Sequence, residues 1–198
     1  MGDRRHDRAV DPTGGSPTFI SDADRVRRVF RTVRANGPAL LVPAAWIVVG
    51  GAVVGVVSEH ALFVAHVVMS LLLVAFLVGS WGEMATGVLR AWKTVILAGT
   101  PVTLAGVVGF LALDGLAVPA EPLLAVALYG WILLPAAGLA YTGRRADATA
   151  RAYDVGAVCC LAGAVGVALA GRPIEMAAGL GVVGVGQTIG IAAATLVE

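Results

Sequence analysis

A histidine lies within an apolar stretch that is long enough to cross a bilayer. The stretch Ala61–Ser80 surrounds His66 with aliphatic residues, and a titratable side chain at such a depth is costly in hydrocarbon. Because histidine changes charge near neutral pH, His66 could relay protons or gate a pathway. A neutral imidazole could instead donate a hydrogen bond to Tyr129, Gln187 or a backbone carbonyl and only tie helices together. Both interpretations stay open.

Further polar side chains fall near the depth of His66 or below it. At 100° per residue, Glu59, His66 and Ser70 differ by less than about 40° around their helix, which predicts a polar stripe leading inward from the outer surface. At 1.5 Å per residue, His66 lies about 8 Å below that surface. The candidate polar cavity consists of Glu59, His66, Ser70, Thr103, Tyr129 and Gln187.

The histidines and cysteines are too scattered to predict a metal centre or a haem. A two-histidine haem site draws its ligands from facing helices, yet His60 lies on the same predicted helix as His66, about 240° around it. Cys159 and Cys160 are adjacent and lack the spacing of a redox pair or a zinc site. We expect no metal and no cofactor.

The sequence lacks the motifs of common enzyme classes. It contains no G-x-S-x-G nucleophile turn, no H-E-x-x-H zinc motif, no glycine-rich phosphate loop and no pair of carboxylates within an apolar run. We therefore expect a protein that is not an enzyme, and we expect no nucleic-acid partner.

Membrane-spanning helices are the elements that would position these residues. The chain has 198 residues, of which 58% are hydrophobic and 14% charged, whereas an average soluble domain is about 25% charged. A helix of about 20 apolar residues crosses the hydrocarbon core, and it pairs all its backbone groups internally. The sequence predicts an all-α bundle of six transmembrane helices in the domain 38–197, with approximate spans at 38–58, 61–80, 94–113, 123–142, 155–170 and 177–197.

The basic residues indicate how the predicted helices are oriented. If the N-terminus is cytoplasmic, all 14 Arg and Lys residues except Arg172 fall on the cytoplasmic side. The positive-inside rule therefore predicts a multi-pass protein of the cell membrane with both termini in the cytoplasm. The outer turns then hold Glu59, Asp114, Glu121 and Glu175.

Two segments precede the first predicted span. Residues 1–20 combine charges with glycine and proline and have too little apolar content to pack, so we expect a disordered cytoplasmic tail. In 21–36, valines and a phenylalanine recur at i, i+3, i+4 and i+7, and arginines cover the other faces. This pattern predicts an amphipathic helix on the membrane surface. A basic segment that only sets the orientation of the chain is the alternative.

Glycines are placed where they would let helices approach closely. Small residues four apart are typical of packing faces between membrane helices. The sequence predicts such faces at Gly51 and Gly55 in the first span and at Gly186 and Gly190 in the sixth.

Two prolines interrupt predicted spans. Pro101 lies in the third and Pro135 in the fourth. Each removes one helical hydrogen bond, so we expect kinks, which could open a cavity or only shape the bundle.

Charged residues follow the second predicted span. Glu83, Arg90 and Lys93 occupy its inner boundary, between Trp81 and Trp92. Glu83 and Arg90 would share a face if the helix continued through them. Such residues commonly form a solvated junction, but they could also form a cytoplasmic gate or a docking collar.

Three functions agree with these features. The first is a transporter, a channel or a substrate-binding membrane component for a small solute or ion, with its polar site around His66. The second is a non-catalytic subunit or assembly partner of a membrane complex, whose glycine-rich sixth span contacts another membrane protein or a second copy. The third is a haem- or copper-binding redox subunit. The lipid bilayer is a partner in each case.

Overall fold

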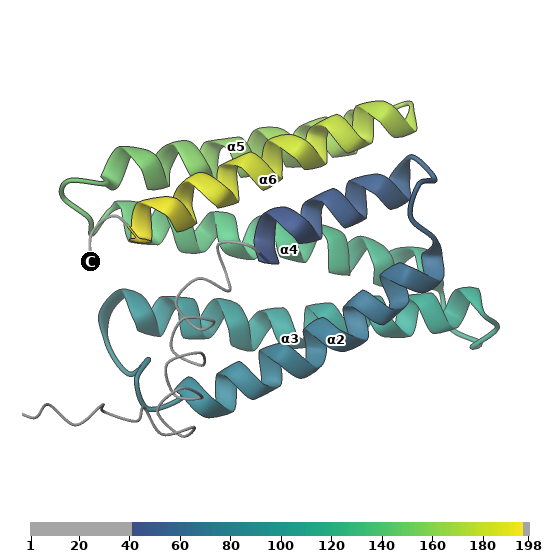
Figure 1. Cartoon of the computed structure of the whole chain (residues 1–198), viewed down its shortest axis with the longest axis horizontal. Helices are drawn as coiled ribbons and strands as arrows, with labels where there is room; N and C mark the ends of the chain where they lie inside the picture. Colours follow the sequence, from purple (N-terminus) through teal and green to yellow (C-terminus); the bar gives the residue numbers. More distant parts are fainter. Residues whose placement is uncertain (1–40, 196–198) are drawn as a thin grey trace, which may run out of the picture. The chain divides into compact units, whose positions relative to one another are not determined.

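The computed structural model describes residues 41–195 of the chain. The chain divides into the units Met1–Asn36 and Gly37–Glu198, and all described residues belong to the second. They contain no strand. The predicted tail at 1–20 and the predicted surface helix at 21–36 lie outside the described residues. The helices are Leu41–Val53, α2 (Glu59–Ser80), α3 (Gly87–Leu113), α4 (Ala120–Gly143), α5 (Ala150–Leu169) and α6 (Pro173–Thr195) (Figure 1).

The prediction of an all-α membrane protein is confirmed for this part of the chain. Five helices, α2 to α6, are each long enough and apolar enough to cross a membrane. The first helix is described from Leu41, the first of the described residues, to Val53. At 1.5 Å per residue this part extends about 20 Å, against a hydrocarbon core of about 30 Å.

The first helix ends at Val53 because of the backbone at Gly55. The φ angle of Gly55 is +78°, in the left-handed region that glycine adopts readily. The amide of Val56 donates to the carbonyl of Gly51 at 2.8 Å, as in a Schellman helix end. The helix therefore ends five residues before the approximate limit of 58 predicted for this span. Gly55 lies beyond the helix end with no atom within 4 Å of its Cβ position, and Gly51 meets Val57 of the turn that follows.

The third span begins earlier than predicted, at Gly87 rather than Thr94. Because α2 ends at Ser80, Glu83 lies in the connecting turn, and it does not share a helical face with Arg90. Long basic side chains can reach the membrane–water interface from a helix, so Arg90 and Lys93 can lie within α3.

Helices α5 and α6 make the most extensive contact because glycines face one another across it. A Cβ atom on Gly156 would lie 2.7 Å from the carbonyl oxygen of Gly186. A Cβ on Gly163 would lie 2.7 Å from the carbonyl oxygen of Gly179. The two pairs lie about two turns apart on both helices, so the backbones touch along a line. Gly190 meets Leu139 of α4, so Gly186 and Gly190 both lie at helix interfaces.

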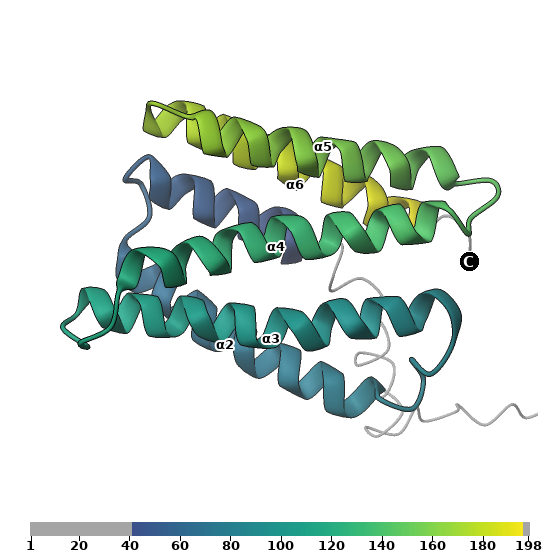
Figure 2. The same cartoon turned by 180° about the vertical axis from the view of Figure 1, so that it is seen from behind.

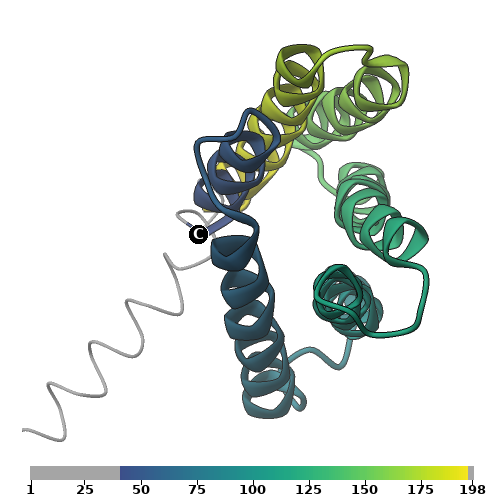
Figure 3. The same cartoon turned by 90° about the vertical axis from the view of Figure 1, so that its right-hand side faces the viewer.

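The other long helices pack beside their neighbours in sequence. Contacts join α2 to α3, α3 to α4, and α4 to α5, as Figures 1 and 2 show. The Leu41–Val53 helix instead lies beside α6 (Figure 3), where the side chain of Trp46 covers Gly184. The core lies among this helix, α4, α5 and α6. It comprises Trp46, Ile132, Ala136, Leu139, Tyr153, Ala157, Cys160, Val167, Leu180, Val183 and Ala193.

Candidate functional site

A chain of hydrogen bonds joins four helices in the interior. The indole Nε1 of Trp46 donates to Gln187 Oε1 at 3.0 Å, and Gln187 Nε2 donates to the carbonyl of Trp131 at 2.9 Å. The indole Nε1 of Trp131 in turn donates to Thr103 Oγ1 at 2.8 Å. We call these four residues the Gln187 network. It connects the Leu41–Val53 helix, α6, α4 and α3.

Pro135 explains why the amide of Gln187 binds to backbone. A proline has no N–H, so the carbonyl four residues before it loses its helical partner. That carbonyl belongs to Trp131, and it accepts from Gln187. Pro101 lies inside α3 and Pro135 inside α4, and each helix continues through its proline. The carbonyl that Pro135 leaves unpaired in α4 is the one that binds Gln187 of α6.

The tryptophans of this network are the part that the sequence analysis missed. Trp46 and Trp131 lie in the middle of apolar runs, whereas membrane tryptophans usually gather at the interfaces. A buried indole N–H needs an acceptor, and Gln187 and Thr103 are among the few deep acceptors available. A third indole, that of Trp92, donates to Thr142 Oγ1 at 3.1 Å and ties α3 to α4.

His66 faces α3 and makes its hydrogen bond within α2. Its Nδ1 lies 2.8 Å from the carbonyl oxygen of Leu62. The ring covers Gly106, where a Cβ would lie 2.8 Å from Nε2, and its centroid is 5.2 Å from that of Phe110. Ser70 donates to the carbonyl of His66 at 2.8 Å. Gly106 therefore gives the imidazole its place between the two helices.

The six predicted cavity residues are not joined into one site by the contacts of the described chain. Thr103 and Gln187 are linked through Trp131. Glu59 is exposed at the start of α2, and Tyr129 packs against the hydrophobic core. Within residues 41–195, every buried side-chain nitrogen and oxygen has a hydrogen-bond partner.

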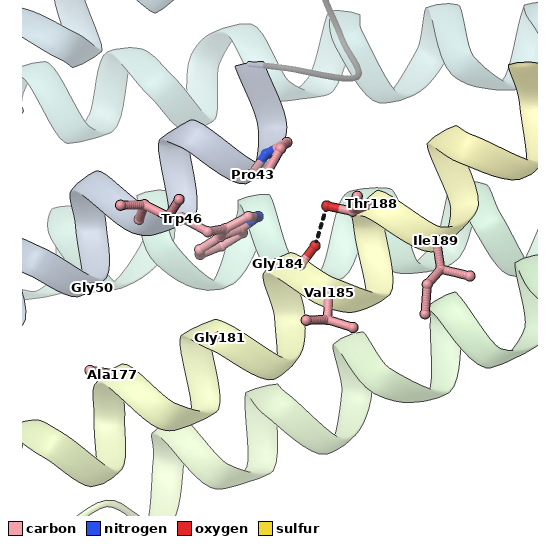
Figure 4. A pocket seen from close by; sticks show the side chains of 10 residues that line it. Pro43, Trp46, Gly50, Ala177, Gly181, Gly184, Val185, Thr188 and Ile189 are labelled. Atoms are coloured by element: carbon pink, nitrogen blue, oxygen red, sulfur yellow. Dashed lines mark hydrogen bonds between the residues drawn. The ribbon is translucent and has the colours of Figure 1, made fainter.

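A groove of about 440 Å³ lies between the Leu41–Val53 helix and α6 (Figure 4). Gly50 and Gly181 leave it open, because no atom lies within 4 Å of a Cβ built on either. Ile47, which is 73% exposed, stands at its edge. The hydroxyl of Thr188 donates to the carbonyl of Gly184 at 2.7 Å and is thereby paired within α6. The groove is lined by Pro43, Trp46, Ile47, Gly50, Ala177, Gly181, Gly184, Val185, Thr188 and Ile189.

The boundary charges lie at the junction of α2 and α3. The Lys93 Nζ lies 3.3 Å from the centroid of the Trp81 ring and donates to the Trp81 carbonyl at 3.1 Å. Arg90 is exposed on the first turns of α3. Glu83 lies in the turn between the helices.

Metal ligands do not gather in the part of the chain that the structure describes. Its His, Cys, Asp and Glu residues include no group of three or more that could hold an ion. His60 contacts Phe63 of its own helix, with ring centroids 6.3 Å apart. The expectation of no metal and no cofactor stays a prediction.

The long apolar helices define the class: this is a polytopic membrane protein. No known protein family, curated protein or solved structure matches the chain.

Proposed function

We propose that this protein is a non-catalytic subunit of a membrane complex, and that the groove between the Leu41–Val53 helix and α6 receives a transmembrane helix of a partner protein. The observation that carries the proposal is the Gln187 network. Thr103 of α3, Trp131 of α4 and Gln187 of α6 are engaged in holding the protein's own helices together.

The chemistry of the groove supports a helix as its occupant. Helices associate in lipid where small residues allow close backbone approach. Gly50 and Gly181 expose backbone in the groove, and the polar group of Thr188 is already paired. An apolar helix therefore gains close contact there without having to supply a hydrogen bond. The transporter hypothesis, which needs a polar path to His66, stays a prediction.

We also propose six spans with both termini in the cytoplasm of a cell-membrane protein. The Leu41–Val53 helix supports a sixth span, because it runs antiparallel to α6: Pro43 lies near Thr188 and Ile189, and the other end leads to the start of α2 (Figures 1 and 4). A tag after Glu198 is then expected to be shielded in intact cells, and labelling of the tag from outside would refute this orientation.

Filling the groove tests the proposed partner contact. Gly181→Leu adds a side chain into open space, so we expect the protein to fold normally but its complex in native membranes to be lost. Gly79→Leu is the matched control, since Gly79 is also an exposed helical glycine with no atom near its Cβ position. The readout is the size of the detergent-extracted complex on a native gel, beside the thermal stability of each purified variant.

The two variants distinguish the outcomes. Loss of the complex in Gly181→Leu alone supports the groove as the contact. A complex that has the mass of two copies identifies the partner as a second copy of this chain. An unchanged complex in Gly181→Leu refutes the proposed docking site.

A further inference from the structure

The described basic residues gather at one end of the helices, apart from one. The α2–α3 and α4–α5 connections lie at the same end (Figure 1), and Arg90, Lys93, Arg144, Arg145 and Arg151 lie at or beside them. The carboxylates there are Glu83, Asp147 and Asp154. Counted over the described residues alone, five positive charges against these three negative charges give a net charge of +2. We call the five basic residues the cationic collar.

The opposite end has the reverse character. Within residues 41–195, the charged residues there are Glu59, Asp114, Glu121 and Glu175 and one basic residue, Arg172. The Nη2 atom of Arg172 forms a 2.6 Å salt bridge with Glu175 Oε1. Among the basic residues of the described chain, Arg172 alone lies in a salt bridge.

Two members of the cationic collar are held against aromatic rings. Lys93 lies over Trp81, with its Nζ 3.3 Å from the ring centroid. The guanidinium of Arg145 lies over Tyr141, 3.6 Å from that centroid. Trp81 is 51% exposed, and aromatic side chains of this kind are typical of the headgroup level of a bilayer. The rings therefore hold both cations in position beside the ends of α2 and α4.

The cations keep donors available for an anion. A lysine ammonium has three N–H donors, and Lys93 gives one to the carbonyl of Trp81. A guanidinium has five, and Arg145 uses one, at 3.5 Å from the carbonyl oxygen of Tyr141. Arg90 and Lys93 are three residues apart on α3, so their like charges repel each other, and a bound anion would offset this repulsion. These features match a phosphate group that carries a negative charge.

We propose that the cationic collar binds anionic phospholipids, with Lys93 on Trp81 and Arg145 on Tyr141 as the two main headgroup contacts. The attraction is the general one between basic residues beside a membrane helix and an anionic leaflet. The arrangement adds two cations that are already positioned by aromatic rings. The proposal does not depend on which protein occupies the groove or on which termini are cytoplasmic.

Lipid titration of the full chain in mild detergent tests the proposal. Phosphatidylglycerol is added, with phosphatidylcholine and free glycerol 3-phosphate as separate arms, and bound lipid is counted by native mass spectrometry. We expect phosphatidylglycerol to bind and to raise the melting temperature, and K93Q/R145Q to weaken its binding about tenfold or more. R172Q, at the other end, is the matched control and should bind as the unmodified chain does.

Two further variants separate charge from folding. K93R/R145K keeps the charges and should restore binding. R90Q/R144Q removes two collar charges that contact no ring, so it should fold normally and bind phosphatidylglycerol more weakly. Equal binding of phosphatidylglycerol by R90Q/R144Q, K93Q/R145Q and R172Q would overturn the proposal. An equal effect of glycerol 3-phosphate would also overturn it, because the collar would then be a site for soluble anions.

Discussion

Among the five long helices, α2 has the highest and α6 the lowest mean hydropathy over the 18 most apolar residues, and their burial runs in the opposite order. Only 6% of the 18 most apolar consecutive residues of α2 are buried, against 44% of those of α6. The buried residues of α2 are Ser70 and Ser80. Those of α6 include Leu180, Val183 and four glycines.

The difference teaches what decides burial inside a membrane. Lipid tails are as apolar as leucine, so a hydrophobic helix gains little by leaving them for a protein neighbour. Close backbone contact and interhelical hydrogen bonds provide the gain instead. Helix α6 has both, through Gly186 against α5 and Gln187 against α4. In α2, the ring of His66 covers Gly106 of α3, and the imidazole bonds within its own helix.

Gly186→Ala should lower the free energy of unfolding more than Gln187→Leu or Gly106→Ala does. The new Cβ would lie 2.7 Å from the carbonyl oxygen of Gly156 and 2.6 Å from Cys159 Cβ, so the α5 backbone itself must move. We expect the free energy of unfolding to fall by about 3 kcal/mol. Unfolding in mixed micelles with increasing denaturing detergent measures it.

Gly79→Ala is the matched control in α2. No atom lies within 4 Å of its Cβ position. Alanine is also the better helix former, so the free energy of unfolding should stay equal or rise by up to about 1 kcal/mol. If Gly186→Ala and Gly79→Ala lowered the free energy of unfolding equally, α6 would be no more closely packed than α2.

Gln187→Leu should have the next largest effect. It leaves the indole N–H of Trp46 and the carbonyl of Trp131 without their partner, at a cost of about 1–2 kcal/mol in the free energy of unfolding. Thr188→Val removes a hydroxyl that binds its own helix and should cost less than about 0.5 kcal/mol. The same micelle titration compares them, and a larger loss for Thr188→Val would contradict the role of the Gln187 network.

Gly106→Ala should lower global stability less than Gly186→Ala or Gln187→Leu does, by less than about 1 kcal/mol, because α2 buries so little. The added methyl group would occupy the place of the His66 ring and push α2 away from α3. Spin labels at the exposed positions Val68 and Leu104 would report a longer or broader distance. His66→Ala in the same chain should restore it, and an unchanged distance in Gly106→Ala would refute the contact.

The sequence predicted the long apolar helices because hydropathy depends on composition alone. It also predicted Gly186 and Gly190 as a packing face and Thr103 and Gln187 as deep polar residues, and all four lie at helix interfaces. It could not predict that Gln187 pairs with the carbonyl freed by Pro135, because this requires knowing that α6 lies against α4.

Local backbone geometry accounts for the wrong boundaries. Gly55 resembles a packing residue in sequence, but its φ angle of +78° ends the first helix. The early start of α3 was missed because Arg90 and Lys93 suggested a loop, although their long side chains leave the helix intact. In both cases the residue type is evident from the sequence, whereas the backbone conformation is not.

Amide hydrogen exchange of the purified chain in detergent tests the central claim most directly, because it reports the free energy of local opening helix by helix. If α6 with the Gln187 network is the core and α2 is peripheral, amides from Gly179 to Gly190 should exchange much more slowly than those from His66 to Val74. Equal protection of the two segments, or slower exchange in α2, would contradict the account.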